Sequence, residues 1–326
     1  MSYSNLQSFL RCTTPTVPSQ SLPKASVRNL IEKWQLSISG DAVEYFTLDD
    51  LWGCYDEWSA YGAGTPICLE NGKTVVQYYT PFLSGIQLYV GKSFSLRRTR
   101  EDSDFEVETD SASSDSEDGK LSTTNSDNSS RTWDLLEDSG AEQDGDNYKM
   151  KERFGELYLQ HFDIAAPHLR LPLRDQINML AEEYPGLKSL RSIDLSPASW
   201  MAVAWYPIYH IPAQRNPKEL YSAFLTYHTL SSSFQDNISM ETVEHINCTD
   251  VKSEEVKMIT KEENGGTNIS LSPFGLASYR MQSHVWIDPK SEDYERLTSL
   301  WRAAASWLMQ LDVYHSDFTF FSSRSI

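Results

Sequence analysis

Features that define several common protein classes are missing from this chain of 326 residues. No run of apolar residues approaches the ~20 that an α-helix needs to cross a bilayer, so we predict no membrane span. The first residues hold no long apolar core behind a basic start, and we therefore expect no secretory signal. Cysteine is scarce, and the 4 cysteines are scattered without a CxxC pair. This pattern is typical of reduced thiols in a cytoplasmic or nuclear protein.

Familiar catalytic and nucleotide-binding motifs are missing as well. The Gly-Lys-Thr at 72–74 ends like a P-loop, but Ile67 stands where the first glycine of that motif belongs. The Gly-Ala-Gly at 62–64 begins like a dinucleotide-binding loop, and its third glycine position is again Ile67. Neither HExxH nor GxSxG occurs. We predict no catalytic residue, no cofactor and no bound metal, and we favour a protein that is not an enzyme.

Basic residues are outnumbered by acidic ones. The chain has 28 Lys and Arg against 46 Asp and Glu, a formal net charge of −18. A nucleic-acid-binding protein needs a basic face, so we predict no nucleic-acid partner. Residues 101–146 alone carry 16 acidic and two basic residues, a net charge of −14. Because this segment has few apolar side chains to offset the entropy of ordering, we expect a disordered acidic insertion at 97–147.

Three serines of this insertion are candidate phosphorylation sites. Ser103, Ser114 and Ser139 each precede a glutamate by three positions. Acid-directed kinases select that spacing because a basic groove recognises the downstream charge, and phosphorylation would deepen the negative charge. A passive, solvated loop is the alternative. We interpret the insertion as a phosphorylatable segment of an interaction or scaffold protein with a protein partner.

The rest of the chain is organised around an aromatic run at 199–212. From Trp200 to Tyr206 both alternating sets of side chains are apolar, which is typical of a strand covered on both faces. Pro207 cannot donate a ladder hydrogen bond, so we predict a bulge, a bend or a sheet edge at this residue. A buried helix is the alternative, and Pro207 would break it.

Hydrophobic periodicity and turn residues predict the other elements. After an N-terminal arm, we predict helices at 26–36, 47–58, 148–161, 172–184 and 291–311. We predict strands at 66–90, 220–230 and 274–287, followed by a strand-like tail at 313–324. The strand at 220–230 should form an antiparallel hairpin with the aromatic run, since their connection is short. Residues 231–271 are polar, and we predict a second disordered insertion there.

These elements predict an α+β fold. We expect a single domain with an antiparallel or mixed β-sheet flanked by helices, plus two disordered insertions. The arm, the first helices and the first strands occupy 1–96, and further helices and the central strands occupy 148–230. The last strand, a long C-terminal helix and the tail occupy 272–326.

The aromatic content, with 9 Trp and 17 Tyr, favours a binding surface. The predicted aromatic groove is lined by Tyr206, Tyr209, Tyr227, Tyr279, His210 and His228. The two histidines lie on paired strands and could hold a metal, although such histidines are more often hydrogen-bonded core or rim residues. Ser196, Ser199 and Asp194 could be combined with His210 into a nucleophilic site, but nothing in their spacing requires it. A small-molecule or peptide-binding domain is therefore the first alternative to a scaffold, and an unrecognised hydrolase or transferase is the second.

Six segments carry a family resemblance. They are SNLQSFLRCTTPTVPS at 4–19, DLWGCYDEWSAYG at 50–62, VVQYYTPFLSGIQLY at 75–89, DLSPASWMAVAWYPIYHIP at 194–212, FGLASYRMQSHVW at 274–286 and VYHSDFTFFSSR at 313–324. The chain resembles, in these segments, a plant family catalogued as Domain of Unknown Function 789. The resemblance implies an uncharacterised plant protein whose ordered blocks form one domain, and it brings no activity, cofactor or catalytic residue.

Overall fold

The computed structural model describes residues 4–34, 41–91, 154–213, 220–232, 267–288 and 290–323. They belong to one compact unit made of Met1–Gly91 and Phe154–Ile326. The predicted acidic insertion, with its three candidate phosphoserines, lies outside the described residues. Of the second predicted insertion, 233–266 also lies outside them, whereas 267–271 is described and contains a short strand.

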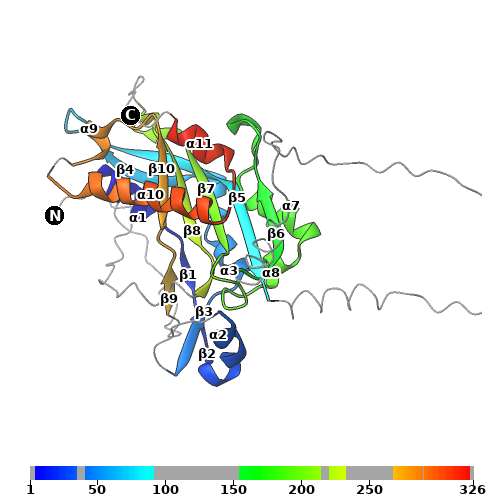
Figure 1. The fold of residues 1–326 in the computed structure, drawn as a ribbon. Helices are drawn as coiled ribbons and strands as arrows, with labels where there is room; N and C mark the ends of the chain where they lie inside the picture. Colours follow the sequence, from blue (N-terminus) through cyan, green and yellow to red (C-terminus); the bar gives the residue numbers. More distant parts are fainter. Residues whose placement is uncertain are drawn as a thin grey trace, which may run out of the picture. The chain divides into compact units, whose positions relative to one another are not determined.

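A curled antiparallel sheet forms the centre of this unit (Figure 1). Its strands are β4 (Ala63–Cys68), β5 (Thr74–Val90), β6 (Glu156–Phe162), β7 (Trp200–Ile211), β8 (Ala223–Thr229) and β10 (Gly275–Tyr279). The order is β10-β8-β7-β5-β4, and β6 also pairs with β5. Two smaller sheets pair β1 (Thr16–Pro18) with β9 (Asn268–Ser270), and β2 (Gln20–Pro23) with β3 (Ala42–Tyr45). The prediction of an α+β fold is confirmed, and the described strand pairs are antiparallel.

The aromatic run forms β7, in the middle of the sheet. β7 pairs with β5 along its length and with β8 over Trp200–Trp205, so the predicted hairpin is confirmed. Trp200 and Trp205 point to opposite faces and are both 0% exposed, as predicted for a strand covered on both sides. The register against β5 shifts where Tyr79 pairs with Pro207 and Tyr78 with Tyr209. This shift is the bulge expected at Pro207.

The described helices surround the sheet. They are α1 (Asn5–Cys12), α2 (Arg28–Trp34), α3 (Leu48–Gly53), α4 (Asp56–Tyr61), α7 (Leu173–Glu183), α8 (Gly186–Ser189), α9 (Ser283–Trp286), α10 (Asp293–Gln310) and α11 (Ser316–Ser322), with 3₁₀ turns η1 (Lys24–Val27) and η2 (Pro167–Leu169). The single helix predicted at 47–58 is two short helices, of which α3 begins with a capping box between Thr47 and Asp50. None of the helices in the described part of the chain combines the length and apolar character needed to cross a bilayer.

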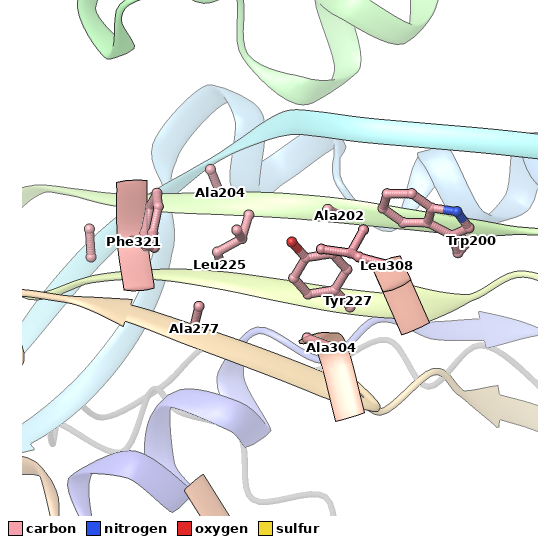
Figure 2. Close-up of a cluster of buried hydrophobic side chains, with 10 residues drawn as sticks. Trp200, Ala202, Ala204, Leu225, Tyr227, Ala277, Ala304, Leu308 and Phe321 are labelled. Carbon is pink, nitrogen blue, oxygen red and sulfur yellow. The ribbon is translucent and has the colours of Figure 1, made fainter. Parts of the chain in front are cut away.

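α10 and α11 cover one face of the sheet. Figure 2 shows the buried cluster that joins them to β7, β8 and β10. Its labelled members are Trp200, Ala202, Ala204, Leu225, Tyr227, Ala277, Ala304, Leu308 and Phe321. A Cβ added to Gly275 would lie 2.8 Å from the Cβ of Ala304, so the glycine permits the close approach of α10 to β10.

α1 packs on the opposite face of the sheet. The side chain of Ser4 caps this helix by accepting a hydrogen bond from the amide of Gln7. The ring of Phe9 contacts four other rings on this face, those of Tyr79, Trp205, Phe224 and Trp286, with centroids 4.2–6.3 Å away. The N-terminal helix therefore completes an aromatic core rather than extending from the domain.

Three predicted elements are wrong, each because tertiary pairing overrides a local pattern. Part of the helix predicted at 148–161 is instead the strand β6, which pairs with β5. Leu159 is the one buried residue of this strand. The strand predicted at 274–287 stops at Tyr279, and α9 follows it. The strand-like tail at 313–324 contains α11, whose buried residues Asp317 and Phe321 are four positions apart, a helical spacing.

Candidate functional site

Of the six residues predicted to line one groove, the two histidines lie far apart, and the four tyrosines differ in burial and in ring contacts. Tyr206 and Tyr279 lie on the α11 side of the sheet, and both rings contact Phe321. Tyr227 lies on the same side but is fully buried. Tyr209 is 45% exposed and stacks on Tyr78, with ring centroids 4.5 Å apart.

The two histidines of the predicted groove do not meet. His228 is fully buried and pairs with Met201, which stands nine positions before His210 on β7. Nine residues of extended strand span about 30 Å, so these histidines cannot share a metal ion. Among the described residues, no group of three or more His, Cys, Asp or Glu side chains could hold a metal ion.

The nucleophilic arrangement considered around His210 is not assembled either. Asp194 forms an ion pair with Arg191 at 2.7 Å, and the hydroxyl of Ser199 bonds to the backbone of Tyr89. His210 pairs with Gln77 at the far end of β7 from Ser199. These side chains serve local turns and strand edges.

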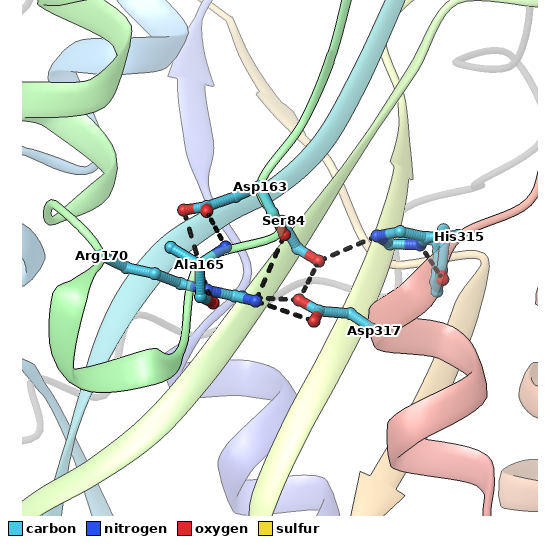
Figure 3. Close-up of polar contacts among 7 residues, drawn as sticks. Ser84, Asp163, Ala165, Arg170, His315 and Asp317 are labelled. Carbon is cyan, nitrogen blue, oxygen red and sulfur yellow. Dashed lines mark hydrogen bonds and ion pairs between the residues drawn. The ribbon is translucent and has the colours of Figure 1, made fainter. Parts of the chain in front are cut away.

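A chain of buried polar side chains, which the sequence did not reveal, lies between the sheet and α11 (Figure 3). Ser84 of β5 places its Oγ 2.9 Å from Nε2 of His315 and 2.5 Å from Oδ2 of Asp317. The hydroxyl of Tyr227, on β8, lies 2.7 Å from Nδ1 of His315. His315 immediately precedes α11 and Asp317 lies in its first turn, so the chain links three elements of the fold.

Arg170 ends this chain with two parallel hydrogen bonds. Its NH1 lies 2.6 Å from Oδ2 of Asp317, and its NH2 lies 2.8 Å from Oδ1. Its Nε donates to the carbonyl of Ala165 at 2.8 Å. The Arg170 side chain is only 3% exposed, and burial lowers its pKa, but the hydrogen bonds and charge of Asp317 outweigh burial and raise the pKa. Arg170 and Asp317 therefore form a buried ion pair with two charge-assisted hydrogen bonds.

The hydrogen-bond acceptors among these buried side chains determine which atom carries each proton. The carboxylate of Asp317 can only accept, so Ser84 donates its single proton to Oδ2. The Oγ of Ser84 is then left to accept from His315, which places the imidazole proton on Nε2. Nδ1 accepts from the hydroxyl of Tyr227. Every link is satisfied by a neutral histidine, and burial lowers the pKa of His315 to about 4, which agrees with that state.

The direction in which these side chains donate protons differs from that in a catalytic triad. In a triad the histidine accepts the proton of the serine, and the carboxylate orients the histidine. Here Asp317 contacts Ser84 directly, and His315 donates to Ser84. A serine anion beside an ionised aspartate would be repelled, so the arrangement does not activate Ser84 as a nucleophile. Its chemical effect is to hold α11 against β5 and β8.

His228 is also fixed in one neutral form. Its Nδ1 donates to the carbonyl of Leu271 at 2.8 Å, and Nε2 accepts from Oγ1 of Thr226 at 2.9 Å. The same Oγ1 accepts from Nε1 of Trp205 at 3.0 Å. Burial lowers the pKa of His228 to about 4. This histidine is a structural link between β8 and the chain that follows β9.

The two buried histidines predict a pH dependence of stability. Their pKa is about 4 in the folded chain against an ordinary value of 6.5, so between these values the unfolded chain binds protons that the folded chain does not. Stability is therefore complete above pH 6.5 and falls as the pH drops toward 4, by about 3 kcal/mol for each histidine. Urea unfolding at half-unit pH steps measures the slope. The His315→Gln variant should lose about half of it, and an unchanged slope would contradict this assignment.

We expect the removal of a tyrosine hydroxyl to stabilise the protein at two buried positions on the side of the sheet that faces α1. Tyr55 and Tyr79 are fully buried, and neither hydroxyl has a hydrogen-bond partner among the described residues. Removing an unpartnered buried hydroxyl recovers part of its desolvation cost, so we expect Tyr79→Phe to raise the free energy of unfolding by about 1 kcal/mol. Tyr227→Phe, which removes a hydroxyl bonded to His315, is the control and should lower it by about 1–2 kcal/mol. Urea unfolding of both variants tests this, and a destabilised Tyr79→Phe protein would contradict it.

The comparison with protein families covers nearly all of this structure. Residues 4–321 match the family model described as "Protein of unknown function (DUF789)". The chain belongs to this family. The family match confirms the predicted family, and the plant origin stays a prediction. The match spans every described helix and strand up to Phe321. No curated protein and no solved structure matches the chain.

Proposed function

We propose that this DUF789 protein is a non-enzymatic interaction domain of the cytoplasm or nucleus that docks an extended peptide at one end of its sheet. The observation that carries the non-enzymatic part of the proposal is the direct hydrogen bond from Ser84 to Asp317, which already engages the serine hydroxyl. The described side chains that most resemble a catalytic group are buried and paired with one another in a way that holds the fold. No disulfide joins the described cysteines Cys12, Cys54 and Cys68, which supports a reducing compartment.

The proposed docking surface consists of aromatic residues of β5, β7, β10 and α11. We call it the tyrosine surface, and its members are Tyr78, Tyr206, Tyr209, Tyr279 and Phe320. Tyr78 stacks on Tyr209 with an interplanar angle of 20°, and Tyr279 stacks on Phe320 at 22°. Tyr209 and Phe320 are 45% and 40% exposed. Stacked, partly exposed rings offer large apolar contact area at little conformational cost, as peptide-binding surfaces require.

The neighbouring backbone supports an extended ligand. β8 pairs with β7 only as far as Trp205, and within the described residues no other strand pairs with that edge of β7 from Tyr206 to Ile211. Ile208 and Ile211 on this segment are 49% and 55% exposed. An added strand would gain main-chain hydrogen bonds at such an edge and place alternate side chains against the tyrosine surface.

The acidic segment supplies the regulation in this proposal. Phosphorylation at Ser103, Ser114 and Ser139 would add negative charge to a segment that already carries a net charge of −14. A basic partner would then be held more tightly by the modified chain. The support for this part is the sequence spacing alone.

Proximity labelling in cells tests both parts separately. The intact chain is compared with a Tyr209→Ser/Phe320→Ser variant and with a matched Met309→Ser/Tyr314→Ser control, whose residues are 76% and 79% exposed on α10 and just before α11. We expect the first variant to lose partners that the control retains. Identical partner lists would contradict the docking surface. A Ser103→Ala/Ser114→Ala/Ser139→Ala variant with the partner list of the intact chain would remove the phosphorylation part alone.

A further inference from the structure

Arg280 is held in an unusual backbone conformation just after the end of β10. Its φ is +54°, and among the described non-glycine residues only Asp312 also has a positive φ. Aspartate tolerates this left-handed region, whereas a bulky side chain adopts it at a cost that glycine would avoid. The buried side chain of Ser222 donates to the carbonyl of Arg280 at 3.3 Å and helps to fix this backbone. A costly conformation that the fold maintains points to a function of the Arg280 side chain itself.

The side chain of Arg280 lies over an aromatic stack. Its guanidinium carbon is 5.1 Å from the centroid of the Tyr279 ring, and Tyr279 stacks on Phe320 with centroids 4.9 Å apart. Arg280 is exposed, and no carboxylate of a described residue lies within ion-pair distance of it. A guanidinium on a ring face can direct its N–H groups outward in one plane, where a carboxylate accepts two parallel hydrogen bonds. The tyrosine surface therefore includes, at Tyr279, a neighbouring cation that is arranged to bind an anion.

Arg280 lies beside the open edge of β7 that the proposed peptide would use. The pairing of β8 with β7 ends at Trp205, and the pairing of β8 with β10 ends where Ala223 meets Tyr279. An added strand on the free edge of β7 would continue the position of β8 in the sheet, between β7 and the line of β10. Neighbouring strands are about 4.8 Å apart, so such a strand would lie within reach of a long side chain that follows β10.

We propose that the docked peptide carries an aspartate or glutamate whose carboxylate binds Arg280. This inference rests on the proposed peptide docking and names one feature of the peptide. A single guanidinium balances one negative charge, which matches a carboxylate. A phosphate carries nearly two charges and is bound by clusters of arginines, and the net charge of −18 disfavours the excess. The basic charge that the acidic segment attracts would lie elsewhere on the partner.

Selection of peptides by the intact chain tests the inference. The immobilised chain selects from random peptides displayed on phage, and only peptides that the Tyr209→Ser/Phe320→Ser variant no longer binds are kept. We expect these peptides to share an Asp or Glu at one position, beside aromatic or aliphatic residues. Fluorescence anisotropy then compares one such peptide synthesised with Glu, Gln or phosphoserine at that position. The intact chain should bind the Glu form about 10-fold more tightly than the Gln form, because charge-assisted hydrogen bonds are lost.

Variants of Arg280 assign the anion to this residue. Arg280→Gln should bind the Glu and Gln peptides equally, whereas Arg302→Gln, which removes an exposed cation on α10, should keep the difference of about 10-fold. Arg280→Lys keeps the charge but lacks the paired N–H groups, so it should recover only part of the difference. Arg280→Gly suits the positive φ and should melt no lower than the intact chain, yet lose the preference for Glu. An arginine with a purely structural role would not show this combination.

The inference and the docking proposal fail through different outcomes. If the selected peptides share no acidic position, or if Arg280→Gln keeps the preference for Glu, the carboxylate site at Arg280 is wrong and the docking surface stands. Tighter binding of the phosphoserine form than of the Glu form would contradict the assignment of a carboxylate. If Tyr209→Ser/Phe320→Ser still binds every selected peptide, or if no peptide is selected, the tyrosine surface is wrong and the inference falls with it.

Discussion

Replacing Arg170 by alanine will lower the free energy of unfolding by about 3–5 kcal/mol, because the buried carboxylate of Asp317 is then left without its cationic partner. The two side chains are 3% and 8% exposed and are joined by two short hydrogen bonds. Ser84 and His315 are affected in the same step, since Ser84 donates to Asp317 and His315 bonds to Ser84. Urea unfolding monitored by tryptophan fluorescence gives the free energies.

Arg174, whose side chain is 24% exposed, provides the control. Arg174 forms ion pairs with Asp56 at 2.9 Å and Asp49 at 3.8 Å, and these carboxylates are more than half exposed. Exposed ion pairs are screened by water, so Arg174→Ala should cost less than about 1 kcal/mol. Arg170→Ala/Asp317→Ala should cost less than the sum of the two single variants, because neither charge is then left alone. Equal effects of Arg170→Ala and Arg174→Ala would contradict the buried chain.

Trp205→Ala is expected to cost about 3–5 kcal/mol, the range for emptying a large aromatic site in a core. Trp205 is fully buried on the α1 side of β7, and its ring contacts those of Phe9, Tyr55 and Trp58. Its Nε1 also donates to Thr226, which in turn bonds His228. The variant therefore leaves both a cavity and a disturbed polar link. Thermal and urea unfolding measure the loss.

Trp301→Ala separates burial from residue type. Trp301 lies on α10, is 39% exposed, and bonds to the hydroxyl of Ser322. Because much of this ring already contacts water, its removal should cost about 1–2 kcal/mol. If Trp205→Ala proved no more destabilising than Trp301→Ala, the packing of helix α1 on β7 would be in error.

The sequence predicted the centre of the fold because its signals there are local. The alternation from Trp200 to Tyr206 and the position of Pro207 depend only on neighbouring residues, and they gave both the buried strand and its bulge. Helix caps such as Ser4 and Thr47 are equally local. The pattern failed at β6 and α11, where the partner surface decides the conformation. A short aromatic tail can be read as strand or helix until its contact with the sheet is known.

The buried polar chain could not be predicted from spacing. Ser84 and Asp317 are 233 residues apart in sequence, and Tyr227 and His315 are 88 apart, so no motif window contains them. Weak signals exist in hindsight. Ser84 interrupts an apolar strand, and His315 and Asp317 are polar residues within an aromatic tail. A polar residue in an apolar context indicates a buried partner but does not say which one.

Nitrogen-15 NMR of the histidine side chains tests the central claim most directly. The resonances of His315 can be assigned by comparison with a His315→Gln variant. At pH 7 the structure predicts a neutral imidazole with its proton on Nε2, because Nε2 donates to Ser84 and Nδ1 accepts from Tyr227. A proton on Nδ1, or an imidazolium, would contradict the account, since Ser84 would then face a possible base and the site would have to be considered as a catalytic one.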